Sequence, residues 1–190
     1  MRRTGVYAST WCLFSALFLS ACATMNTDSA STANTNPEDE QLIAKQPDYS
    51  SRIPQHIDTY GERAVVVDPN VHVWGAYDAN GDLMRAGLAV AGADWCSDLG
   101  RQCHTSAGSF RVFSLGDVNC KSSIFPIPRG GAPMPYCMRF HNGQALHGVP
   151  ENELAEANLS HGCVRMHVYD AEWLRFNFVN VGTKVVVKSY

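Results

Sequence analysis

The pattern of apolar residues over the C-terminal two thirds of the chain predicts short strands rather than long helices. The segments with β-branched or alternating apolar residues are 64–68, 72–77, 83–90, 109–113 and 184–188, and residues 145–147 are expected to end one more strand. Asp-Ala-Asn-Gly-Asp at residues 78–82 has the composition of a turn. Apolar residues between 169 and 178 indicate one short helix. We therefore expect a mostly β domain, a sandwich or barrel-like fold with a short helix.

The beginning of the chain has a different pattern. Arg2 and Arg3 precede an apolar run that covers most of residues 6–19 and ends in Leu-Ser-Ala before Cys22. The run is short for a membrane-spanning helix, and small residues directly before a cysteine resemble a bacterial lipoprotein signal. We expect residues 1–21 to be removed and Cys22 to carry lipid. An ordinary signal peptide, with Cys22 incidental, is the alternative.

Residues 22–61 are rich in Ser, Thr, Asn, Asp, Gln and Pro and contain few large apolar residues. Such a segment buries too little apolar surface to fold alone, so we expect a flexible tether followed by a folded domain at 62–190. In the lipoprotein family an aspartate after the lipidated cysteine favours retention at the inner membrane. Ala23 stands there instead, so the resemblance implies an outer-membrane anchor, with the domain in the periplasm.

Composition excludes some classes of function. Hydrophobic residues make up 45% of the 190 residues and charged residues 17%, which is ordinary for a globular protein. The formal net charge is −3, and the sequence contains no run rich in Lys and Arg. The electrostatic signature of a nucleic-acid-binding protein is therefore missing.

The segment with the clearest chemistry is Ser-His-Gly-Cys-Val-Arg at residues 160–165. A cysteine attacks an acyl group as a thiolate, which requires a nearby base, and the tetrahedral intermediate requires main-chain amides around its oxyanion. Cys163 is the candidate nucleophile and His147 the candidate base. The amides of Gly162 and Cys163 are the candidate oxyanion donors. A histidine base must be oriented by an acceptor, and we expect a main-chain carbonyl.

These residues resemble the signature of the L,D-transpeptidase (YkuD-type) family. His147-Gly148 followed by the motif at 160–165 is the most specific part. The strand at 65–68, Thr-Ser-Ala-Gly-Ser-Phe at 105–110 and Pro-Met-Pro-Tyr at 133–136 are similar to other family segments, with Ser106 where proline is usual. Because the segments occur in the family's order, the resemblance covers most of the expected domain.

The resemblance implies a β sandwich whose active-site cleft contains the cysteine. The family cleaves the L-to-D peptide bond before the terminal D-alanine of a peptidoglycan tetrapeptide stem, through a thioester, and transfers the acyl group to an amine. Cys163 would be the nucleophile and His147 the base and later the acid. The expected substrate pocket comprises Ser160, His161, Arg165, Tyr136 and Gly148, although Arg165 could instead brace the loop. No metal or organic cofactor is implied, and carbapenem-type β-lactams would acylate Cys163.

Five cysteines remain after the expected signal and Cys22. Their odd number in an oxidising compartment suggests two disulfides and one free thiol. On proximity in sequence we predict Cys96–Cys103 and Cys120–Cys137, although four cysteines allow three pairings and all four could be reduced. A zinc site of Cys163 with nearby histidines lacks the usual ligand spacing.

Two other functions stay open at this point. A carboxypeptidase or amidase would share the thioester and use water as the acceptor. A non-catalytic envelope or host-interaction lipoprotein on the same fold would need neither Cys163 nor His147, and a Cys163→Ala variant with full biological effect would favour it.

Overall fold

The computed structural model describes residues 47–190. The expected signal segment, Cys22 and most of the expected tether therefore lie outside the described residues. Within residues 47–190 no helix combines the length and the apolar character needed to cross a membrane.

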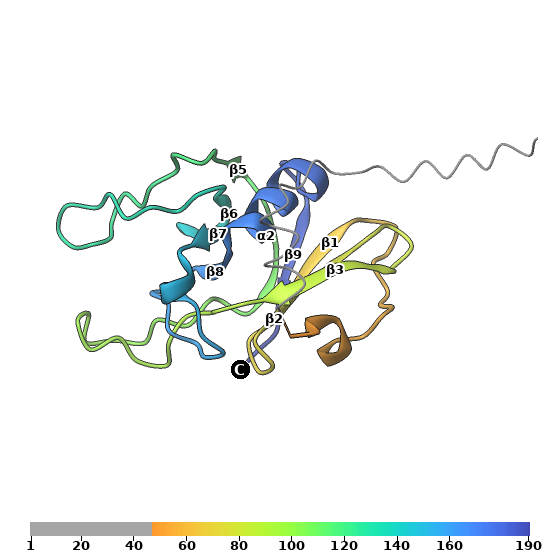
Figure 1. The fold of residues 1–190 in the computed structure, drawn as a ribbon, viewed down its shortest axis with the longest axis horizontal. Helices are drawn as coiled ribbons and strands as arrows, with labels where there is room; N and C mark the ends of the chain where they lie inside the picture. The colour runs from red at the N-terminus through yellow and green to blue at the C-terminus, as the bar shows by residue number, and fades with distance from the viewer. Residues whose placement is uncertain (1–46) are drawn as a thin grey trace, which may run out of the picture. The chain divides into compact units, whose positions relative to one another are not determined.

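The domain is built from two β-sheets (Figure 1). The first has the spatial order β3 (Leu83–Leu88), β2 (Val73–Tyr77), β1 (Ala64–Asp68), β9 (Lys184–Val187) and β4 (Gly108–Arg111). The second has the order β5 (Ser114–Leu115), β6 (Met138–His141), β7 (Gln144–Val149) and β8 (Val164–His167). β1 pairs with β9 and β7 pairs with β8 in parallel, and the other pairings are antiparallel. The expected mostly β sandwich is confirmed.

The main core lies between the sheets and beneath the C-terminal helix. β8 leads directly into α2 (Val168–Trp173), which continues as the π-helical turn η3 (Leu174–Phe178). Side chains from both sheets and this helix share one apolar cluster, including Val65, Val67, Trp74, Met138, Leu146, Val164, Met166, Ala171 and Leu174. Burial of this cluster fixes the position of β7, which contains His147, and of β8, which begins directly after Cys163.

Most predicted elements agree with the structure, with shifted ends. The segment predicted over 83–90 ends its strand at Leu88, and Val90 instead forms a single bridge to Arg165. His147 lies inside β7 rather than at its end. The sequence reading missed β5 and β6, which are short and partly polar.

The end of the expected tether packs against the folded domain. A 3-10 turn, η1 (Tyr49–Arg52), precedes it, and the Tyr49 side chain is buried against Val73 and Leu88 of the first sheet. The Ile57 amide donates to the Gly81 carbonyl, and the Leu83 amide donates to the Gln55 carbonyl. The polar composition of the segment concealed these contacts, because few of its side chains are apolar and many of its contacts are hydrogen bonds.

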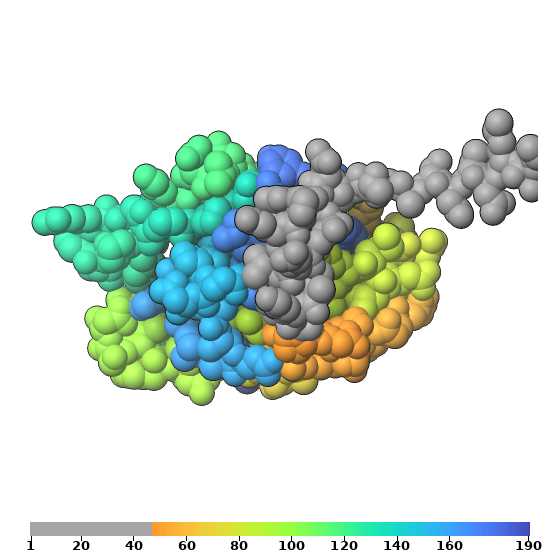
Figure 2. Space-filling model, in the orientation of Figure 1, coloured from red at the N-terminus to blue at the C-terminus, as the bar shows by residue number. Residues whose placement is uncertain are grey.

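Two loops project from the same side of the domain, one after β3 and one between β5 and β6 (Figures 1 and 2). Each contains one disulfide: Cys96–Cys103 in the first and Cys120–Cys137 in the second, with Cα–Cα distances of 5.9 Å and 6.1 Å. The structure therefore has the predicted pairing. Cys163 is the free cysteine among residues 47–190. We call these loops the 91–105 loop and the 116–137 loop.

Candidate active site

Cys163 lies immediately before β8, and His147 lies within the neighbouring parallel strand β7. The strand register aligns Leu146 with Val164 and His147 with Arg165. This pairing brings two residues that are sixteen positions apart in sequence to the same end of the second sheet. Both side chains line one cavity. The structure thus brings together the two residues expected to carry the chemistry.

His147 is almost fully buried, at 4% exposure. Its Nδ1 lies 2.9 Å from the main-chain oxygen of Gly148. Because a carbonyl oxygen only accepts, Nδ1 carries the proton and donates it, which leaves the lone pair on Nε2 in the neutral ring. Burial lowers the pKa of His147 from 6.5 to about 4. The ring is therefore neutral at physiological pH and able to accept a proton, and its orienting partner is a main-chain carbonyl, as expected.

The thiol of Cys163 is held in its neutral form at rest. Burial raises the pKa of Cys163, while a hydrogen bond from the Ala145 amide and the charges of Arg165 and Arg139 oppose that rise. The sulfur also lies 3.9 Å from the Gly143 carbonyl oxygen. With a neutral thiol beside a neutral imidazole, proton transfer accompanies attack on a substrate rather than preceding it.

The turn before Cys163 is braced by Ser160, which changes the expected oxyanion donors. The Gly162 amide donates to Ser160 Oγ at 3.0 Å, and Ser160 Oγ donates to the Cys163 carbonyl. The Gly162 amide is thus engaged within the turn. Among residues 47–190 the amides of His161 and Cys163 have no acceptor. Those two amides, rather than Gly162 and Cys163, are the available oxyanion donors.

Cys163 lies where two cavities meet. The first, of about 80 Å³, is lined by His147, Val149, Glu153, Ser160 and Arg165, and we call it the His147 cavity. The second, of about 240 Å³, is lined by Arg101, Arg139, Asn142, Gly143 and Gln144, and we call it the Gln144 cavity. The two share the side chains of Ser122, Phe125, Met134, His161 and Cys163. The thiol is therefore reachable from two directions.

Three expected pocket residues do lie in the His147 cavity, namely Ser160, His161 and Arg165. Arg165 is 23% exposed at its side chain and lies 3.9 Å from a carboxylate oxygen of Glu153. This long ion pair leaves guanidinium N–H groups directed at the cavity available for a substrate carboxylate.

The other two expected pocket residues lie elsewhere. Tyr136 has a positive φ of 59°, and its hydroxyl donates to Glu172 of α2 at 2.8 Å while its ring packs against Phe176. Gly148 packs against α2 so closely that a Cβ would lie 2.8 Å from Val168 Cα. Neither residue lines the two cavities. Gly148 acts instead through its carbonyl, which orients His147.

The sequence reading missed the side chains that the two loops contribute. Phe125 lines both cavities, and its ring lies 4.6 Å from the His161 ring, centroid to centroid. Asp98 Oδ2 lies 2.8 Å from His161 Nε2. Both residues lie in loops, where no periodic sequence pattern shows which side chains face Cys163.

One group of residue types that bind metals lies near the turn. Among the described residues, ligand atoms of Cys96, Asp98 and His161 lie within 4.8 Å of one another. The Cys96 sulfur is committed to the disulfide with Cys103. A thiolate is the form in which cysteine binds a metal, so the oxidised loop does not offer a complete set.

Comparison with known families decides the class of the protein. The YkuD model, described as the L,D-transpeptidase catalytic domain, matches residues 62–187. The chain belongs to this family. Membership implies an enzyme acting on the bacterial cell wall. Comparison with curated protein sequences finds no significant match.

Solved L,D-transpeptidases share the fold. One from Xylanimonas cellulosilytica is 21% identical with a TM-score of 0.59, over 80% of this chain and 70% of that chain. L,D-transpeptidase 3 from Mycobacterium tuberculosis, with a faropenem-derived adduct, is 23% identical with a TM-score of 0.54, over 67% and 60%. LdtMt1 in complex with imipenem is 24% identical with a TM-score of 0.55, over 66% and 58%. The chain thus spans less than two thirds of the latter two.

Proposed function

We propose that this protein is a peptidoglycan L,D-transpeptidase whose nucleophile is Cys163 and whose base is His147. The observation that carries the proposal is the placement of both side chains on one cavity, with His147 in β7 and Cys163 immediately before the parallel strand β8, in a domain of this family. The substrate class is a tetrapeptide stem with an L-to-D peptide bond before its terminal D-alanine.

In the proposed acylation step His147 Nε2 accepts the thiol proton while the Cys163 sulfur attacks the carbonyl carbon of the L-to-D bond. The oxyanion accepts hydrogen bonds from the amides of His161 and Cys163. Collapse of the tetrahedral intermediate breaks the peptide bond, and His147 returns the proton to the departing D-alanine amine. A thioester on Cys163 results.

Transfer to an amine completes the reaction. An acceptor amine attacks the thioester carbon, His147 again relays the proton, and the Cys163 thiol leaves. The meeting of two cavities at Cys163 supports transfer rather than hydrolysis, because one cavity can hold the acyl chain while the acceptor approaches through the other. Water as the acceptor would give a carboxypeptidase on the same thioester.

Incubation with disaccharide-tetrapeptide fragments, followed by mass spectrometry, tests the proposal. Loss of the terminal alanine with formation of cross-linked dimers is expected, and Cys163→Ala should abolish both. Alanine loss without dimers, including with added amine acceptors, would identify a carboxypeptidase. Absence of any reaction, together with failure of imipenem to form a covalent adduct, would contradict an active enzyme.

We also propose that Cys22 anchors the enzyme by lipid to the outer membrane, with its domain in the periplasm. The basic start, the apolar run and the small residues before Cys22 support this proposal. Several acyl chains, at about 0.8 kcal/mol for each buried methylene, would hold the protein at a membrane.

Metabolic labelling with a fatty-acid analogue tests the anchor. Label is expected on the wild-type protein, which should fractionate with outer membranes, and Cys22→Ser should remove the label. Unlabelled wild-type protein with an N-terminus other than Cys22 would favour an ordinary signal peptide.

A further inference from the structure

The turn that carries Cys163 is held from behind by the strand-like start of the 91–105 loop. The Ser160 amide donates to the Ala91 carbonyl at 3.0 Å, and the Ala93 amide donates to the Ser160 carbonyl at 2.9 Å. On the other side of the turn, Val90 and Arg165 exchange two hydrogen bonds of 2.9 Å each. Residues 90–93 therefore bracket both ends of the catalytic turn.

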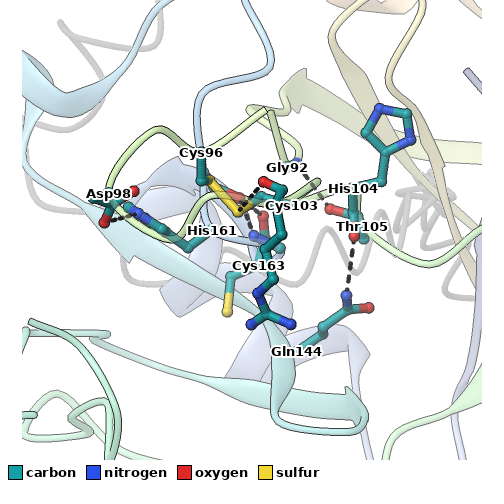
Figure 3. The surroundings of a disulfide bond; sticks show 12 residues. Gly92, Cys96, Asp98, Cys103, His104, Thr105, Gln144, His161 and Cys163 are labelled. Atoms are coloured by element: carbon teal, nitrogen blue, oxygen red, sulfur yellow. Dashed lines mark hydrogen bonds and ion pairs between the residues drawn. A yellow bond between two sulfur atoms is a disulfide. The ribbon is translucent and has the colours of Figure 1, made fainter. Parts of the chain in front are cut away.

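The Cys96–Cys103 disulfide closes this loop against the same turn. The Cys103 amide donates to the Ala93 carbonyl at 3.2 Å, and the Cys103 carbonyl oxygen lies 3.5 Å from the position that a Cβ on Gly162 would take. The Cys96 amide donates to the Arg101 carbonyl at 2.9 Å, which forms a tight turn around Asp98. Figure 3 shows the disulfide near His161, and the Cys96 sulfur lies within 4.8 Å of a His161 ring nitrogen.

Asp98 contacts His161, and His161 in turn lines the cleft. Its carboxylate lies 2.8 Å from His161 Nε2 (Figure 3), and the His161 ring also contacts the ring of Phe125 from the 116–137 loop. The His161 side chain is 30% exposed and lines both cavities. Without a partner, a partly exposed imidazole on a glycine-containing turn has several rotamers available.

We propose that Asp98, presented by the Cys96–Cys103 disulfide, is a positioning residue for acyl transfer: it fixes His161 and thereby the turn whose His161 and Cys163 amides receive the oxyanion. This inference rests on the proposed function. The disulfide confines a loop of eight residues, so Asp98 remains near His161 when substrate enters the cleft. The rate of acylation of Cys163 therefore depends on whether Cys96 and Cys103 form their disulfide.

The physical reason is preorganisation. Donors already aimed at a developing oxyanion stabilise it without reorganising, and loss of one such donor costs about a hundredfold to a thousandfold in rate. A turn that samples other geometries retains its thiol but presents its amides correctly for only part of the time. The expected loss is therefore smaller, about tenfold, and specific to reactions that pass through an oxyanion.

The chain offers a matched control within the same loop. His104 and Asp94 form a second pair at 2.6 Å, but His104 stacks on Tyr190 and lines neither cavity. The experiment compares Asp98→Asn, Cys96→Ser/Cys103→Ser and Asp94→Asn with the wild-type full chain. Two rates are measured on Cys163: acylation by imipenem, which forms an oxyanion, and alkylation by iodoacetamide, which does not. Thermal unfolding reports folding.

We expect imipenem acylation to fall about tenfold in Asp98→Asn and in the double cysteine variant. Alkylation should stay within about twofold, and Asp94→Asn should match the wild type in both rates. Equal acylation in Asp98→Asn and the wild type would overturn the inference. Equal losses of acylation and alkylation would also overturn it, because the loop would then act on the thiol itself. A wild-type protein that imipenem does not acylate would contradict the proposed function instead.

Discussion

The two histidines beside Cys163 are held in opposite ways. His147 is buried on a central strand, and its partner is the main-chain carbonyl of the next residue. His161 is partly exposed on a turn, and its partners are side chains from two disulfide-containing loops. His147, the proposed base, is therefore positioned by the sheet itself, whereas His161 in the wall of the cleft is positioned by the two loops. Substitutions of His147 and of His161 should consequently slow acylation by different amounts and for different reasons.

The largest difference is expected between the rates of His147→Gln and His161→Gln. Loss of a general base costs about 100-fold to 10,000-fold, whereas loss of a positioning ring should cost about tenfold. Rates of imipenem acylation measured by mass spectrometry would show this, with thermal unfolding as the control for folding. Similar losses of acylation rate in the two variants would show that the two histidines do not have different roles.

A second prediction concerns stability against pH. The pKa of His147 is 6.5 in the unfolded chain and about 4 in the fold. Between these values the unfolded chain binds a proton that the folded chain does not, so lowering the pH from 6.5 to 4 should reduce the free energy of unfolding, by about 3 kcal/mol in all.

Asp170 acts in the opposite direction. Burial raises its pKa from 3.8 to about 6, so the folded chain binds the extra proton there and gains stability as the pH falls through that window. Urea unfolding of the wild type and His147→Gln at several pH values separates the two effects. The wild type should lose stability relative to the variant as the pH falls from 6.5 to 4; parallel curves would show that His147 is not buried as a neutral base.

Gly148→Ala should displace His147 indirectly, because the added methyl group disturbs the packing of β7 against α2. The added Cβ would lie 2.8 Å from Val168 Cα, which is main chain and cannot turn aside. We expect a loss of about 1–3 kcal/mol in the free energy of unfolding, and slower acylation because the Gly148 carbonyl orients His147. Denaturant unfolding and imipenem kinetics measure both. An unchanged acylation rate in a destabilised variant would show that the added Cβ does not displace the carbonyl of residue 148 from His147.

The smallest effect is expected from Phe125→Ala on the loop side. An aromatic contact such as that of Phe125 with His161 contributes about 0.5–1.5 kcal/mol, which corresponds to a few-fold higher KM for stem peptide with little change in stability. Phe113→Ala is the control, because Phe113 is 55% exposed and lines neither cavity. Equal KM values for the two variants would exclude Phe125 from substrate binding.

Sequence alone determined the class of the fold and the family of this protein, and it singled out the residues of the proposed chemistry. Strand periodicity is local, so short apolar segments identified β1, β2 and β9 without knowledge of their partners. The Ser-His-Gly-Cys motif around Cys163 is equally local, and the disulfide pairing followed the nearest cysteines in sequence. These features could be predicted because each depends mainly on residues that are close together in the chain.

Tertiary structure decided the parts that depend on long-range contacts. It docked residues 49–61 onto the first sheet, turned Tyr136 toward α2, and engaged the Gly162 amide with Ser160. It also brought Asp98 and Phe125 into contact with His161, from two different loops whose side-chain directions no sequence pattern shows. A periodic pattern reports which side of a strand is buried, but the direction of a loop side chain is set by whatever packs beneath the loop.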